Sequence, residues 1–117
     1  MPDSISQLQA RLRAFAEKRD WQQFHSPKNL SMALIAEAAE LVEHFQWLTE
    51  EQSRSLTEEK REAVRLELAD IFIFLIRAAD QLDVDLIEAA NDKTDINERR
   101  FPVDKVLGDQ RRGVDYR

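Results

Sequence analysis

LELADIFIFLIRAA, residues 66–79, is apolar on nearly every side of the helix that it would form. A surface helix of a globular protein has one apolar stripe, whereas a helix that is apolar all round is buried among others. The segment therefore predicts a helix in the centre of a bundle. By helical periodicity, its main inward sector holds Val64, Leu68, Ile71, Leu75 and Leu82.

Capping signals and apolar periodicity predict three further helices around this one. Ser4 and Gln7 stand at capping-box spacing, and so do Asp85 and Glu88. Thr57 precedes two glutamates at the start of the central helix, which suits a helix N-terminus. The four predicted helices cover residues 5–19, 29–48, 57–82 and 85–100.

The composition agrees with a helical fold. Two glycines and three prolines in 117 residues leave little room for the turns of a β-protein. Pro102 stops the last predicted helix, and the polar, Gly-containing segment that follows is typical of a loose chain end. We therefore predict an all-α, four-helix bundle-type protomer, with one domain over residues 1–102 and a flexible tail over residues 103–117.

Charge and residue usage exclude several classes of function. A net charge of −6 argues against binding to nucleic-acid polymers or anionic membranes. The absence of cysteine excludes disulfides and thiolate metal sites. No apolar run approaches the roughly 18 residues that a membrane span needs, and no signal peptide is evident. These features predict a cytoplasmic protein.

Two of the predicted helices carry acids beside their apolar stripes. Glu37 and Glu40 are three residues apart in one helix, and Glu67 and Asp70 in the other. If the two helices pack antiparallel, the pairs can face each other. Carboxylates held that close repel one another, so either their pKa values rise or cations neutralise them. Hard divalent ions such as Mg²⁺ or Mn²⁺ prefer oxygen ligands of this kind.

Two other interpretations of the acids compete with a metal site. Acids three residues apart are commonly a solvated face, and Lys60, Arg61, Arg65 and Arg77 are close enough in sequence to form salt bridges. A ferritin-like di-iron site would require Glu-x-x-His pairs, and neither His25 nor His44 follows a glutamate by three. A non-catalytic helical oligomerisation module, with the acids in salt bridges, remains the alternative from another class.

The last predicted helix adds a basic cluster, and aromatic residues gather near helix ends. Lys93, Asn97 and Arg100 fall on one side of their helix, where they could clamp anionic oxygens or pair with nearby acids. The aromatic residues are commonly core caps, but beside a phosphate site they could stack on a base; they are Trp21, Phe24, Trp47 and Phe101.

Five segments together resemble a known family. EAAE at 37–40 and ELAD at 67–70 resemble the E-x-x-E…E-x-x-D signature of MazG-like nucleoside triphosphate pyrophosphohydrolases. RDWQQFHSPKNL at 19–30, FQWL at 45–48 and KTDINERRFP at 93–102 resemble the flanking segments of the dCTP pyrophosphatase branch, in the same order. The resemblance extends from residue 5 to residue 102.

The resemblance implies both a fold and an activity. The fold is an all-α bundle that assembles into homodimers or homotetramers. The activity is Mg²⁺-dependent hydrolysis of a (deoxy)nucleoside triphosphate to the monophosphate and pyrophosphate, for control of the nucleotide pool. dCTP or a modified dCTP is the expected substrate, with broader or dUTP-directed specificity as the alternative.

The resemblance also assigns roles to individual residues. Mg²⁺, with Mn²⁺ as a substitute, would be held by Glu37, Glu40, Glu67 and Asp70, which form the catalytic set. Phosphate or sugar would be bound by Lys93, Asn97 and Arg100, assisted by Lys28, where relatives often have arginine. The base pocket would be formed by Trp21, His25, Trp47 and Phe101. Which acid serves as general base, how many ions bind and which base is preferred do not follow from the sequence.

Overall fold

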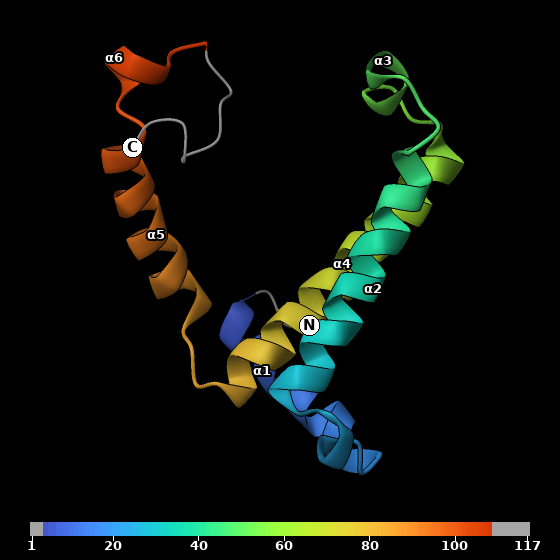
Figure 1. Cartoon of the computed structure of the whole chain (residues 1–117). Coiled ribbons are helices and arrows are strands. Elements are labelled where there is room, and N and C mark those ends of the chain that lie inside the picture. The colour runs from blue at the N-terminus through green and yellow to red at the C-terminus, as the bar shows by residue number, and fades with distance from the viewer. Residues whose placement is uncertain (1–3, 109–117) are drawn as a thin grey trace. The chain divides into compact units, whose positions relative to one another are not determined.

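The computed structural model describes residues 4–108, and over those residues every regular element is a helix (Figure 1). In chain order they are α1 (Ile5–Lys18), η1 (Gln22–Phe24), α2 (Pro27–Phe45), α3 (Glu50–Ser53), α4 (Glu58–Gln81), α5 (Leu86–Arg100) and α6 (Val103–Val106). The all-α prediction is confirmed. The chain divides into two compact units between Asp83 and Val84, and each unit is described by itself.

The first unit is built on two long helices. α2 and α4 run side by side in opposite directions, joined through α3, and α1 packs against α4 (Figure 1). The antiparallel arrangement that would bring the two acid pairs together is thus present. The most deeply buried side chains come from all three helices; they are Ala16, Leu30, Val64, Ile76, Arg77 and Ala79.

The predicted caps begin the helices as expected. The side-chain oxygens of Ser4, Thr57 and Asp85 each accept a hydrogen bond from the backbone N–H three residues later. α2 begins two residues earlier than predicted, because Ser26 caps it and Pro27 occupies its first position. A proline fits there, since its fixed φ is helical and the N–H that it lacks would have no partner inside the helix.

Three short helices lie where the sequence predicted loops. α3 occupies the polar connector, and Thr49 and Gln52 close it with a reciprocal capping box. η1 forms one turn in the aromatic loop before α2. α6 begins the segment that was predicted to be a flexible tail, and residues 109–117 of that tail lie outside the described part of the chain.

The predicted inward sector of α4 is largely wrong. Val64 is buried as expected, but Leu68, Leu75 and Leu82 are 51%, 39% and 59% exposed. Ile76 and Ala79 are buried instead. The reason is that α4 is apolar nearly all round, so periodicity does not select a face. Its neighbours in the first unit, α1 and α2, cover one side and leave the other open.

The second unit contains α5 and α6. Asp85 caps the start of α5, and the carbonyl of Asn97 accepts a hydrogen bond of 2.8 Å from the N–H of Phe101 at its end. Pro102 then precedes α6. Among the described residues, none of the helices is both long and apolar enough to cross a membrane.

Candidate metal and nucleotide site

Three of the four predicted acids come together between α2 and α4. One carboxylate oxygen each of Glu37, Glu67 and Asp70 lies within 4.8 Å of the others. Glu37 comes from α2 and the other two come from α4, so the cluster exists only because the helices pack antiparallel. Glu40, which is exposed, lies outside this group of three but interacts with both Glu37 and Glu67.

Two oxygens of the cluster are buried without a hydrogen-bond donor. The Oε2 atoms of Glu37 and Glu67 have no partner among the described residues. Burying a carboxylate in this state is unfavourable unless a proton or a cation compensates it. A proton shared between Glu37 and Glu67, together with burial and the nearby charge of Glu40, raises the pKa of Glu37 from 4.5 to about 7.

The pKa of Glu67 is raised, as that of Glu37 is. The hydrogen bond to Glu37 lowers the pKa of Glu67, but burial and the charges of Glu40 and Asp70 outweigh it, so the pKa of Glu67 is raised as well. His44 lies beside Glu67, with its Nε2 4.0 Å from Oε1 of that residue. That contact crosses from α2 to α4, and the sequence reasoning did not find it.

The basic side chains proposed as salt-bridge partners do not reach the acid cluster. Arg65 pairs with Glu62 at 2.7 Å, and Arg77 pairs with Asp80 at 3.2 Å. Over residues 4–108, none of the ion pairs joins a lysine or an arginine to any of the four predicted ligands. The possible metal ligands are therefore carboxylate oxygens, with an imidazole nearby and no lysine or arginine of the described residues paired to them. Such a set of ligands fits a hard divalent cation.

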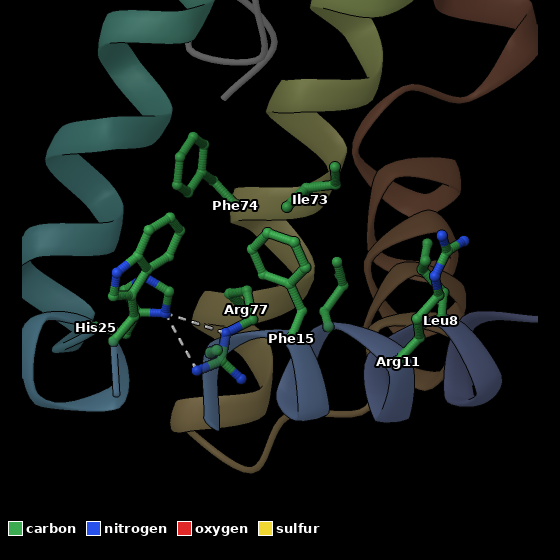
Figure 2. A pocket seen from close by; sticks show the side chains of 10 residues that line it. Leu8, Arg11, Phe15, His25, Ile73, Phe74 and Arg77 are labelled. Atoms are coloured by element: carbon green, nitrogen blue, oxygen red, sulfur yellow. Dashed lines mark hydrogen bonds between the residues drawn. The ribbon is translucent and has the colours of Figure 1, made fainter. Parts of the chain in front are cut away.

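An apolar pocket of about 400 Å³ lies in the same unit, between α1, α4 and the loop around η1 (Figure 2). Its apolar walls come from α1 and α4 and include Leu12, Phe15 and Phe74. Trp21 and His25, both predicted for base recognition, line it as well. The Trp21 ring meets Phe15 edge-on, with 5.7 Å between ring centroids. This volume falls within the range of small-molecule sites.

Two other predicted site residues of the first unit lie away from this pocket. Lys28 is exposed in the first turn of α2. Trp47 follows the other end of that helix and is 86% exposed. The 19 residues of α2 span about 28 Å, so Trp47 and Trp21 do not share one pocket within a protomer.

The remaining predicted residues belong to the second unit. Lys93, Asn97 and Arg100 recur along α5 at intervals of four and three residues, which places them on one side of the helix. The guanidinium of Arg100 lies 5.4 Å from the ring centroid of Phe101. Their part in a site with the acid cluster stays a prediction.

Sequence reasoning missed two residues of the pocket region that the structure brings out. Phe74 and Arg77 of α4 both line the pocket, and Arg77 contacts His25 (Figure 2). A usable signal was present in the chain, because Arg77 is a single basic residue within an otherwise apolar helical segment. A charge in that position needs partners from neighbouring elements.

Fold and site together define an all-α protein whose antiparallel helices present a carboxylate cluster suited to a divalent cation. A family model described as MazG-like matches residues 33–115. dCTP pyrophosphatase 1 of Bos taurus is 46% identical over 91 residues, which are 76% of this chain and 54% of that protein. The Homo sapiens protein of the same name is 44% identical over 90 residues, 75% of this chain and 53% of that protein.

A solved structure agrees with these sequence relatives. The crystal structure of a pyrophosphatase from Archaeoglobus fulgidus matches with a TM-score of 0.81 and 34% identity, over 87% of this chain and 95% of that one. The chain spans about half the length of the curated relatives it matches. It belongs to the MazG-like family.

Proposed function

We propose that the protein is a nucleoside triphosphate pyrophosphohydrolase, which converts a (deoxy)nucleoside triphosphate and water to the monophosphate and pyrophosphate. The observation that carries this proposal is the cluster of Glu37, Glu67 and Asp70, with two buried carboxylate oxygens that lack donors. Membership of the MazG-like family supports it, and so do the names of the curated relatives.

Glu37, Glu67 and Asp70 would hold Mg²⁺, with Mn²⁺ as a substitute, and Glu40 would complete the acidic set. A bound cation supplies positive charge for the triphosphate and makes a bound water more acidic. The carboxylates fix where that charge sits, and one of them can accept the proton of the attacking water. A negatively charged protein can bind a negatively charged substrate in this way, because the cation reverses the local field.

The apolar pocket supplies a place for the base. Trp21 offers an aromatic face for stacking, and His25 is a polar group at the same wall. dCTP or a modified dCTP is the substrate that the family resemblance favours, and the names of the curated relatives support it. Broader or dUTP-directed specificity on the same scaffold is the alternative.

Residues outside the pocket complete the proposed substrate contacts. Lys93, Asn97 and Arg100 of α5 would bind phosphate or sugar oxygens, with Lys28 assisting. An arginine can bind two such oxygens at once, whereas lysine acts as a point charge. Phe101 would add an aromatic contact to the base, and Trp47 would do so from a second copy, since the length of α2 separates it from the pocket of its own protomer.

The protein would act as a homodimer or homotetramer. On α2, Ile35 and Val42 are 67% and 58% exposed, and the open side of α4 exposes Leu68, Phe72 and Leu75. Apolar side chains in this number on two adjacent helices favour burial against another copy. We also propose a cytoplasmic location, which suits a role in nucleotide-pool control.

The test is to incubate the purified protein with Mg²⁺ and a panel of triphosphates and to separate the products. Monophosphate with pyrophosphate is the expected pair. Diphosphate with phosphate would mean a different reaction, and no turnover would favour the non-catalytic oligomerisation module. A Glu37→Gln variant should lose the turnover. Its matched control is Glu62→Gln, since Glu62 is an exposed glutamate of α4 that pairs with Arg65 outside the acid cluster.

A further inference from the structure

Arg77 is a buried charged side chain outside the acid cluster. It is only 3% exposed, and its guanidinium contacts the imidazole of His25 (Figure 2). The same guanidinium also hydrogen-bonds to the carboxylate of Asp80. Nε and Nη2 of Arg77 lie 3.4 and 3.3 Å from Nδ1 of His25, and Nη1 donates to Oδ2 of Asp80 at 3.2 Å. One guanidinium thus joins the loop after η1 to α4.

Asp80 is itself anchored from α1. Arg13 donates two hydrogen bonds to its carboxylate, at 2.6 and 3.1 Å, and Gln9 donates a third at 3.1 Å. Because Gln9 and Arg77 also hold Asp80, the loss of Arg13 alone leaves the hydrogen bond between Arg77 and Asp80 in place. Arg13 is a natural comparison for Arg77, since it shares Asp80 but does not contact His25.

The contact with Arg77 decides which nitrogen of His25 carries the proton. An arginine can only donate hydrogen bonds, so Nδ1 of His25 must accept. In a neutral imidazole the proton is then on Nε2, which remains as the donor of the ring. Burial and the positive charge of Arg77 also lower the pKa of His25, which favours the neutral ring.

This tautomer gives the pocket a uniform hydrogen-bonding character. Its polar side chains among the described residues are Arg11, Trp21, His25 and Arg77. Arginine and tryptophan side chains are donors only, and His25 in this tautomer presents a donor as well. The opposite tautomer would present an acceptor. A donor-only pocket suits a ring edge that carries acceptors, as the adjacent O2 and N3 of cytosine do. Uracil has an N–H at the second of these positions.

We propose that Arg77 is a positioning residue that holds His25 as the Nε2–H tautomer, so that the pocket accepts a nucleobase edge with adjacent acceptors and disfavours one with an N–H. The identity of the occupant as a nucleobase rests on the proposed function. The state of the His25 ring does not, because it can be measured in the free protein.

The first measurement is the tautomer itself, by long-range ¹H–¹⁵N NMR of the two histidines at neutral pH. A His44→Gln variant assigns the signals, since His25 is then the only histidine. We expect the wild-type ring to be neutral with its proton on Nε2. Arg77→Met should give a mixture of tautomers, and Arg13→Met should leave the His25 signals unchanged. An Nδ1–H or doubly protonated ring in the wild type would overturn the proposal.

The second measurement is steady-state kinetics with dCTP and dUTP at saturating Mg²⁺. Losing one hydrogen bond to the base should raise KM for dCTP about two- to tenfold in Arg77→Met, with kcat nearly unchanged. The preference for dCTP over dUTP should shrink. If Arg13→Met has the same effects, Arg77 acts only by stabilising the α1–α4 junction, and the proposal is wrong.

Two further outcomes are also decisive. If Arg77→Met does not fold, Arg77→Gln replaces it, because an amide can both donate and accept and therefore does not fix the tautomer of His25. A mixture of tautomers is expected in that variant, and a pure Nε2–H ring would overturn the proposal. If the wild type hydrolyses no triphosphate, the proposed function fails. A shift of the His25 Nε2 signal on addition of dCMP, absent in Arg77→Met, would still support the role of Arg77, and no shift in the wild type would refute it.

Discussion

A buried carboxylate without a hydrogen-bond donor must either take up a proton or bind a cation, and Glu37 is such a carboxylate. Its Oε2 is buried without a partner, beside the carboxylates of Glu67 and Asp70. Glu37→Gln and Asp70→Asn should therefore reduce Mg²⁺-dependent turnover by at least about 100-fold, since even an outer partner of a metal ligand is worth 10–100-fold. The fold should persist, which circular dichroism can check.

The control for these variants is Glu62→Gln, which removes a carboxylate of α4 that pairs with Arg65 away from the cluster. It should keep near wild-type activity at every Mg²⁺ concentration. If Glu37→Gln or Asp70→Asn behaves like this control at low Mg²⁺, that residue is not a metal ligand.

The raised pKa of Glu37 also predicts how stability depends on pH without metal. Between its unfolded value near 4.5 and its folded value of about 7, the folded state binds a proton that the unfolded state does not. The contribution of the Glu37 proton to the free energy of unfolding is therefore fully present below pH 4.5 and is lost as the pH rises through 7. Metal-free protein should melt at a lower temperature at pH 8 than at pH 5.5.

His25 has a lowered pKa and acts in the opposite sense, so wild type must be compared with Glu37→Gln. The amide cannot titrate, and the fall in melting temperature from pH 5.5 to pH 8 should be smaller in that variant. An equal fall in both proteins would mean that Glu37 does not hold the proton.

At the scale of single residues, the sequence predicted the acids but not their partners. Glu37 and Asp70 could be found because they interrupt apolar stripes at helical spacing. The contact between His44 and Glu67 could not, because it depends on the axial offset of α2 against α4. The same holds for Arg77 and His25, which are 52 positions apart in the chain.

At the scale of elements, the sequence predicted where the helices begin, but it did not predict which face of α4 is buried. Ser4, Thr57 and Asp85 begin their helices as predicted, because a cap depends only on residues three positions apart. The face that α4 buries depends on its neighbours. A helix that is apolar all round carries too little periodicity to choose between Leu75, which is half-exposed, and Ile76, which is buried.

These two neighbouring residues should respond differently to substitution. Ile76→Ala opens a cavity in the core and should cost about 2–5 kcal/mol of unfolding free energy, measured by denaturant titration. Leu75→Lys should leave the helical content unchanged but lower the molar mass measured by light scattering, because a charge then lies on the proposed interface between copies. Gln81→Lys, an exposed position of α4, is the matched control. An unchanged molar mass in Leu75→Lys would place the interface elsewhere.

At the scale of the whole molecule, we predict that one group of residues recognises the base and another binds phosphate. Trp21 lines the apolar pocket of the first unit, and Arg100 belongs to α5 of the second unit. Base–aromatic stacking contributes roughly 1–3 kcal/mol, so Trp21→Ala should weaken binding by about one to two orders of magnitude and blunt discrimination among bases. Arg100→Ala should weaken all triphosphates alike, since a phosphate contact carries no information about the base.

The decisive measurement ranks dCTP, dUTP, dTTP and dATP by kcat/KM for each variant. Phe24→Ala is the control, because Phe24 is an exposed aromatic of the same loop that does not line the pocket. A Trp47→Ala variant tests whether a second copy of the chain contributes to base recognition. The α2 helix between Trp21 and Trp47 spans about 28 Å, so Trp47→Ala can change the ranking only if Trp47 of a second copy reaches the base. If Trp21→Ala keeps the wild-type ranking and Arg100→Ala scrambles it, the base and phosphate roles are assigned the wrong way round.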